Sequence, residues 1–304
     1  MKYITTVCGK LDSSKVGFVN SHEHVYTYLA HPDGSYTYVI TDIDKMEAEL
    51  RELKEVGVDL LIDATGINMG RNPDFMRSMS INTGVNIVCT TGFYRDQFIP
   101  ERIRKMSDDE VFNVVVNEVE NGIEYTTVKP GMLKIGISKD RITEEEFRMA
   151  RILAKVQQKT GLPLYVHCTD GTCAPEMARY LIGQGAIKEK VIMGHVDVPK
   201  DKEYLEELCG LGVNVSMDKF GRDVDSEDAD RVEIVRYLVE KGLIGQILLG
   251  GDMGHPKYLK NFGGKPGYVY IKTKVVPHLM RVGLSESDID KLFRENVIRL
   301  FAHE

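Results

Sequence analysis

The sequence predicts an α/β protein, a (β/α)8 TIM barrel formed by a single domain over residues 1–304. Three observations support this fold: eight short apolar runs of strand length, amphipathic segments between them, and a chain length that suits eight such units. Barrels of this kind typically need about 250 residues plus insertions. A doubly wound open sheet is the alternative, but no glycine-rich nucleotide-binding motif follows the first strand, so a nucleotide-binding version of that sheet has little support.

The expected strands are rich in aliphatic and β-branched residues. Runs such as DLLIDA, NIVCTT and QILLGG are continuous rather than alternating, which is typical of parallel strands buried on both faces. In chain order, we expect strands at residues 17–20, 59–64, 86–91, 132–137, 164–168, 191–194, 213–217 and 247–250.

The segments between the strands carry helix signals. The pairs Ser107/Glu110 and Thr143/Glu146 match the capping box, in which a hydroxyl and a carboxylate bind free amides of the first helical turn. The second helix should end at Gly161, because glycine readily adopts the left-handed conformation found just past a helix. Similar amphipathic stretches are IDKMEAELRELKEVG, EYLEELCGLG and ADRVEIVRYLVEKG.

Charge and composition exclude several classes of partner. The net charge of −7 argues against a nucleic-acid or anionic membrane surface, because phosphate groups attract clustered Lys and Arg. No apolar run approaches the roughly 20 residues that span a bilayer, and the N-terminal segment lacks the apolar region of a signal peptide. Five cysteines without a CxxC pair fit reduced thiols. We therefore expect a cytoplasmic protein that binds neither nucleic acid nor membrane.

Two histidines, His22 and His24, follow the first expected strand. Residues two apart in an extended chain point to the same side, so both rings can hold one metal ion while Glu23 faces away. An HxH pattern alone is weak, because a single histidine at a strand end is more often a hydrogen-bonded core residue.

Three further side chains suited to metal binding end other strands. His167 ends the fifth strand, His195 the sixth and Asp252 the eighth. Barrel enzymes build their sites at the C-terminal ends of the strands, so these residues should meet His22 and His24 at one end of the barrel. Imidazole nitrogens and a carboxylate together suit Zn²⁺ or a similar first-row ion.

Lys134 lies within the fourth strand, in GMLKIGIS, and should point into the barrel, where an unpaired ammonium is costly to bury. One interpretation is a carbamate formed with CO₂, an anion with two oxygens that can bridge two metals. The alternatives are a buried salt bridge with Asp63 or Asp252, or the Schiff-base lysine of an aldolase-type barrel. An aldolase lysine would not need four inward histidines.

Taken together, these residues resemble the phosphotriesterase-related family of the amidohydrolase superfamily. The resemblance extends over nearly the whole chain. Besides HEH, Lys134, His167, GHVD and GGD, it includes DATGINMGRNP, TGVNIVCTTGFY and NGIEYTTVKPGMLKIG.

The resemblance implies a binuclear metal site and assigns its ligands. One ion is expected on His22, His24 and Asp252, the second on His167 and His195, with carboxylated Lys134 and a hydroxide bridging both. The hydroxide would attack the substrate, and Asp252 would accept its proton. Zn²⁺ is the first choice of metal, and Mn²⁺ or Co²⁺ also fit.

The resemblance also indicates a small-molecule substrate, a lactone. Members with a tyrosine at the position of Tyr94 tend to be lactonases, and Lys219 occupies the place of a basic residue in the loop after strand seven. A subgroup acts on phosphorylated sugar lactones and holds the phosphate with an arginine and a tyrosine after the strand-eight aspartate. Here Tyr258 keeps its place, but His255 replaces the arginine, and Lys257 is expected to compensate. The family often forms dimers, so a homodimer is one option for the assembly.

Other functions remain open. A phosphotriesterase or another ester hydrolase of the same family is less favoured, since the chain has no Trp with which to build a large aromatic cage. Metal-dependent DNases of the superfamily usually carry glutamate in place of Lys134. From a different class, the chain could be a metal-binding barrel without catalysis.

Overall fold

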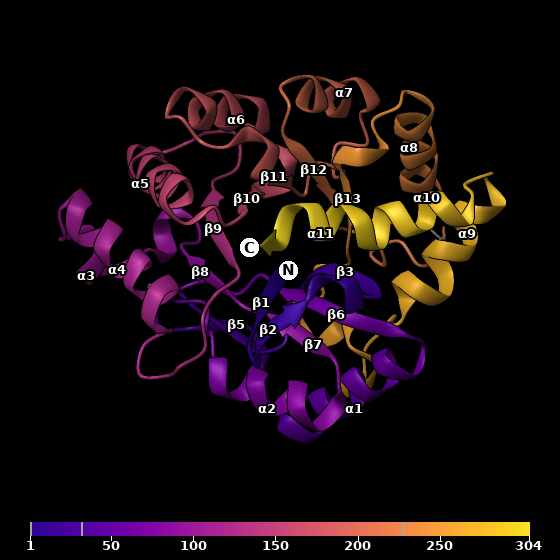
Figure 1. Ribbon diagram of the computed structural model, residues 1–304, viewed down its shortest axis with the longest axis horizontal. Helices are drawn as coiled ribbons and strands as arrows, with labels where there is room; N and C mark the ends of the chain where they lie inside the picture. The colour runs from indigo at the N-terminus through magenta and orange to yellow at the C-terminus, as the bar shows by residue number, and fades with distance from the viewer. Residues whose placement is uncertain (1, 32, 227) are drawn as a thin grey trace.

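The computed structural model describes residues 2–31, 33–226 and 228–304 and contains the predicted barrel (Figure 1). Neighbouring barrel strands pair in parallel. In order they are β3 (Phe18–Glu23), β6 (Val58–Asp63), β7 (Asn86–Val88) continued by β8 (Thr90–Gly92), β9 (Met132–Ile137), β10 (Leu164–Cys168), β11 (Val191–Gly194), β12 (Asn214–Met217) and β13 (Ile247–Leu249).

The last barrel strand lies beside the first. The Ser21 hydroxyl donates to the carbonyl of Leu249 at 2.6 Å, and the amide of Asp252 donates to the carbonyl of His22 at 3.0 Å. These bonds join β13 to β3 and bring the C-terminal ends of the two strands together.

All eight predicted strands are present, three of them with the predicted bounds. The main differences concern the first strand, which extends to Glu23 and so includes His22, and the third, which is interrupted at Cys89. Both capping boxes are confirmed. The hydroxyls of Ser107 and Thr143 each accept from the backbone amide of the glutamate three residues later, and the carboxylate of that glutamate accepts from the backbone amide of the Ser or Thr.

Helices surround the strands, as Figure 1 shows. Gly161 ends α5 at φ 68°, as predicted. The helices are α1 (Ile43–Glu55), α2 (Pro73–Thr83), α3 (Glu101–Arg104), α4 (Asp108–Asn121), α5 (Glu144–Thr160), α6 (Ala174–Gly183), α7 (Lys202–Gly210), α8 (Ala229–Glu240), α9 (Val276–Arg281), α10 (Glu286–Asp290) and α11 (Asn296–Phe301). Within the described residues, no helix is both long and apolar enough to cross a membrane.

Two small sheets add to the barrel and were not predicted. β1 (Tyr3–Thr6), β2 (Gly9–Asp12) and β14 (Ala302–His303) form an antiparallel sheet from the two ends of the chain. β4 (Thr27–Ala30) and β5 (Tyr36–Ile40) form a hairpin between β3 and α1. The hairpin directly follows the HEH motif, so it starts at the C-terminal end of the barrel.

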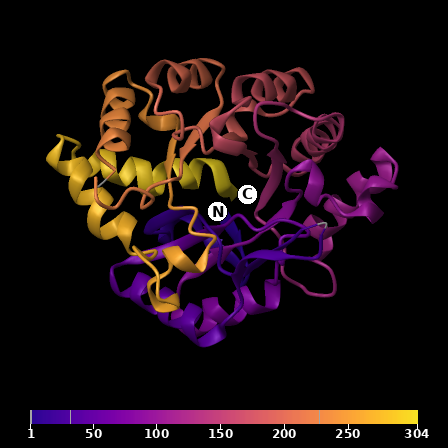
Figure 2. The same cartoon turned by 180° about the vertical axis from the view of Figure 1, so that it is seen from behind.

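Apolar packing occurs in two layers. Inside the barrel, Val19, Ile62, Met132, Ile192 and Leu248 belong to one buried cluster, while a larger cluster joins the outer faces of the strands to the helices. The segment after β13 reaches α1, where the buried Glu49 carboxylate accepts from the amides of Asn261 and Tyr268 at 2.9 and 3.1 Å. Figure 2 shows this orange segment beside the indigo helix.

Candidate metal centre

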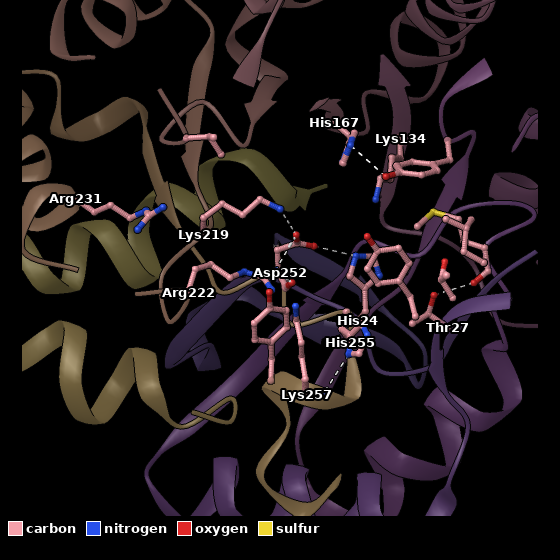
Figure 3. A pocket seen from close by; sticks show the side chains of 18 residues that line it. His24, Thr27, Lys134, His167, Lys219, Arg222, Arg231, Asp252, His255 and Lys257 are labelled. Atoms are coloured by element: carbon pink, nitrogen blue, oxygen red, sulfur yellow. Dashed lines mark hydrogen bonds and ion pairs between the residues drawn. The ribbon is translucent and has the colours of Figure 1, made fainter. Parts of the chain in front are cut away.

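The structure brings the six predicted metal-site residues together at the C-terminal end of the barrel. Figure 3 shows four of them, His24, Lys134, His167 and Asp252, around one cavity. His22 and His195 lie deeper, and each is only 1% exposed.

His22, His24 and Asp252 form a compact group of donor atoms. Nε2 of His22 lies 3.3 Å from Oδ1 of Asp252, and Nε2 of His24 lies 3.2 Å from the same oxygen. Nε2 of His22 is also buried without a hydrogen-bond partner. A buried, unbonded nitrogen is costly unless another group binds it, so this donor set fits a first-row divalent cation.

His167 and His195 form a second pair. Nδ1 of His167 faces Nε2 of His195 at 2.6 Å. Burial lowers the pKa of His195 to about 4 and that of His24 to about 3. These rings are therefore neutral at pH 7 and have lone pairs available for a metal.

Lys134 is buried beside these groups. Its ammonium donates to the carbonyl of Ala64 at 2.6 Å and, among the described residues, forms no ion pair. The predicted alternative of a salt bridge with Asp63 or Asp252 is therefore wrong; Asp63 instead accepts from the amides of Val25 and Thr65. Burial lowers the pKa of Lys134 to about 8, which increases the fraction of neutral amine at pH 7.

Asp218, which follows β12, is a central residue that the sequence analysis missed. It is fully buried, and its two oxygens accept from Nδ1 of His22 at 2.9 Å and Nδ1 of His195 at 2.6 Å. The Nε2 atoms of His22 and His195 are then left as acceptors for a metal ion. Its position at a strand end, in SMDK, was the available signal. The atoms of His22, His195 and Asp218 are close enough to hold a metal themselves, but these hydrogen bonds account for their proximity.

The backbone around Asp252 is fixed by the first strand. Asp252 adopts φ 47°, and His195 φ 61°, conformations that are unfavourable outside glycine and often occur at functional sites. The amide of Met253 donates to Glu23 Oε2 at 2.7 Å. Glu23, whose other oxygen accepts from the Asn20 side chain at 2.9 Å, therefore helps to hold the segment that carries Asp252.

The cavity above these residues measures about 600 Å³ and has two different walls. One is apolar and includes Leu29, Met69 and Tyr94, which belong to a small buried cluster. The hydroxyl of Tyr94 lies 3.2 Å from Nε2 of His167. All four predicted substrate-binding residues line the cavity, namely Tyr94, Lys219, Lys257 and Tyr258.

The second wall, which we call the cationic wall, consists of Lys219, Arg222 and Lys257. Lys219 and Arg222 both contact the carboxylate of Asp252. The Arg222 guanidinium lies 3.7 Å from the ring centroid of Tyr258, and the Lys257 ammonium 4.9 Å from it. The sequence analysis missed Arg222, although it lies three residues after Lys219 in the same loop.

Arg231 supports the loop that carries Lys219 and Arg222, two of the three residues of the cationic wall. Its guanidinium donates to Asp197 at 2.6 Å and to Asp228 at 2.7 Å. Asp197 in turn accepts from the backbone amides of Asp218 and Lys219, both at 3.2 Å. This buried network connects the loops after β11 and β12.

Comparison with known proteins identifies the family. The model of the phosphotriesterase family matches residues 2–301. A phosphotriesterase homology protein of Escherichia coli is 30% identical, covering 94% of this chain and 98% of the relative. A phospho-furanose lactonase of Mycoplasmopsis synoviae is 28% identical, covering 100% and 92%. The human N-acetyltaurine hydrolase is 31% identical, covering 96% of each chain.

The fold is also found among solved structures. The crystal structure of a lactonase from Listeria monocytogenes superimposes with a TM-score of 0.92 at 29% identity, covering 98% of both chains.

Proposed function

Because the chain belongs to the phosphotriesterase family, we propose that this metal-dependent hydrolase is a binuclear lactonase that opens a sugar lactone bearing an anionic group. One observation carries the proposal. Four histidines, Lys134 and Asp252 converge on one end of the barrel, beneath a cavity with a cationic wall. The names of similar proteins, among them a phospho-furanose lactonase, support the reaction class.

The side chains divide into two sets of ligands. His22, His24 and Asp252 would hold one ion, His167 and His195 the other, and Lys134 would supply the anionic oxygens of a carbamate. When bound, two Zn²⁺ ions, or Mn²⁺ or Co²⁺ in their place, would lower the pKa of a bound water and polarise the scissile carbonyl.

Lys134 is suited to carbamate formation. Its neutral amine adds to CO₂, forming an N–C bond and releasing a proton, and burial increases the neutral fraction by lowering the pKa to about 8. Nearby carboxylates, among them Asp252 and Asp63, favour the ammonium, but among the described residues none forms a direct ion pair with it.

Asp252 is the proposed proton acceptor. Burial disfavours its charge, but the ammonium of Lys219 and the neighbouring histidines hold the pKa of Asp252 well below its usual range. The group therefore stays ionised, the form that accepts a proton. Lys219 and Arg222 contact its carboxylate from the cavity side and orient it.

The cationic wall is the proposed site for the anionic group of the substrate. Lys257 and Arg222 lie over the Tyr258 ring, so two cations and a phenol face the same region of the cavity. His255, which replaces the expected arginine, accepts from the amide of Lys257 at 3.0 Å and so helps to fix the lysine backbone. Arg222 supplies a guanidinium from the loop after β12.

A substitution of Lys257 tests this role. We expect Lys257→Ala to raise KM for a 5-phosphorylated 1,4-lactone about tenfold, because it removes one charge-assisted contact, and to leave an unsubstituted lactone nearly unchanged. Lys260→Ala is the matched control, since Lys260 pairs with Glu52 at 2.7 Å and does not line the cavity. Equal effects of both substitutions, measured by steady-state kinetics, would contradict the assignment.

A second candidate reaction is hydrolysis of an N-acyl amino sulfonate. The human relative is named an N-acetyltaurine hydrolase, and the cationic wall would bind a sulfonate as well as a phosphate. The apolar wall of Leu29, Met69 and Tyr94 could accommodate a small acyl group.

A substrate panel distinguishes these functions. The metal-loaded and chelator-treated proteins should be assayed with 1,4-lactones with and without a 5-phosphate, N-acetyltaurine and a phosphotriester. We expect the metal-loaded protein to hydrolyse the phosphorylated lactone fastest and chelation to remove the activity. Bound metal without hydrolysis of any compound would instead identify a metal-binding protein without catalysis.

A further inference from the structure

The β4–β5 hairpin presents an unusual surface at the end of the barrel that holds the site. Four successive residues of β5, Tyr36 to Val39, are exposed although two are tyrosines and one is valine. Contiguous exposed apolar side chains often mark an interaction site or a ligand-binding groove. The feature therefore needs an explanation beyond the stability of the fold.

The base of the hairpin is firmly attached. The amide of Tyr28 and the hydroxyl of Thr27 both donate to the carbonyl of Met69, at 3.0 and 2.9 Å. Gly70 allows this approach, since a Cβ there would lie 2.6 Å from the Tyr28 amide nitrogen. Leu29 and Ile40 are buried beneath the hairpin. The base of the hairpin is therefore held in place, and its residues Thr27 and Leu29 line the cavity.

A β-bulge lies at Tyr38. Thr27 pairs with Ile40 and Leu29 with Thr37, so Tyr28 alone faces two residues, Tyr38 and Val39. Tyr38 itself adopts φ 57°, a left-handed conformation that is uncommon for an aromatic residue. Bulges of this kind redirect a side chain and are frequent beside active sites.

The bulge gives Tyr38 a different environment from Tyr36. Tyr38 lines the cavity and its ring lies 5.8 Å from that of His255, the residue that begins the segment with Lys257 and Tyr258. Tyr36 packs near Tyr28, is 61% exposed and does not line the cavity. Tyr38 thus lies near the cationic wall at the cavity mouth.

We propose that Tyr38 is a specificity-determining residue, whose ring covers the substituted part of a furanose-type lactone held by the cationic wall. This rests on the proposed function. The ring stacks on the apolar face of the sugar, while the scissile carbonyl lies deeper, beside Lys134 and Asp252. The effect of Tyr38 on hydrolysis should therefore depend on the substituent of the lactone and not on the ester bond.

Kinetics on matched substrates test the proposal. We expect Tyr38→Ala to lower kcat/KM for a 5-phosphorylated 1,4-lactone about tenfold, and to leave unsubstituted γ-butyrolactone within about twofold. Tyr38→Phe should retain the wild-type ratio between the two substrates, because it keeps the ring. Tyr36→Ala is the control and should change neither substrate. A uniform loss on both substrates in Tyr38→Ala would overturn the proposal.

A binding measurement separates this proposal from the proposed function. The natural chain contains no Trp, so Tyr38→Trp and Tyr36→Trp each introduce a single fluorescent reporter. Ribose 5-phosphate, a furanose with an anionic group, should change the fluorescence of Tyr38→Trp saturably and that of Tyr36→Trp very little. This response without lactone hydrolysis would overturn the lactonase function alone, whereas equal or absent responses would overturn the role of Tyr38.

Discussion

Lys134→Ala should lower metal-dependent hydrolysis about 10³-fold or more. The substitution removes the anionic oxygens that the carbamate would supply, and loss of metal-assisted stabilisation of the transition state amounts to several kcal/mol, at about 1.4 kcal/mol for each factor of ten. Among the described residues, the Lys134 side chain makes one hydrogen bond, to Ala64, so its loss should disturb the surrounding strands little. The measurement is kcat/KM on the best substrate of the panel, together with the melting temperature of both proteins.

Two controls separate the carbamate from other roles of this lysine. Lys134→Glu restores a carboxylate and should recover part of the activity lost in Lys134→Ala. Incubation of the wild-type protein with ¹³C-bicarbonate should give a carbamate carbon signal that is absent from both variants. Full activity in Lys134→Ala would refute the role assigned to Lys134. Trapping of Lys134 by borohydride with a carbonyl substrate would favour the aldolase alternative.

Asp218→Asn should weaken the binding of both metal ions by about 10- to 100-fold, the usual effect of losing a group that orients a metal-binding histidine. Asp218 serves both sets of ligands, because it accepts from His22 of the first and His195 of the second. An amide has only one accepting oxygen, so at least one histidine loses its acceptor and faces an NH₂ group. Titration of the metal-free protein with Zn²⁺ measures both dissociation constants.

Asp223→Asn is the matched control for this variant. Asp223 belongs to the same loop and pairs with Arg231 at 3.0 Å, but in the described part of the chain it forms no hydrogen bond or ion pair with His22 or His195. Its substitution should leave metal binding unchanged. If only one ion were weakened in Asp218→Asn, the role of Asp218 would be limited to one set of ligands, and unchanged affinity for both ions would contradict the role.

The barrel and the strand-end positions of the candidate metal-site residues could be predicted from the sequence because both depend on local patterns. Buried parallel strands read as continuous apolar runs, so β9, β10 and β11 have the bounds that the sequence predicts. Because the C-terminal ends of these strands meet at one end of the barrel, a residue such as His167 could be placed from its position alone.

The remaining features depend on contacts between distant parts of the chain. Asp218 lies 196 residues from His22, and no local pattern relates the two. Strand β5 of the hairpin is exposed at four successive residues and lacks the alternation of a half-buried strand, so its sequence resembles a loop. In the sequence, Arg222 cannot be distinguished from other charged residues of a polar loop, and only the fold shows that it lies over the Tyr258 ring.

The most direct test of the account is the number of divalent ions bound to each chain. Wild-type protein reconstituted with Zn²⁺ and dialysed should retain two ions per chain by elemental analysis, and the Lys134→Ala variant should retain fewer. A wild-type protein that retains no ion, or a variant that retains two, would contradict a binuclear centre completed by Lys134.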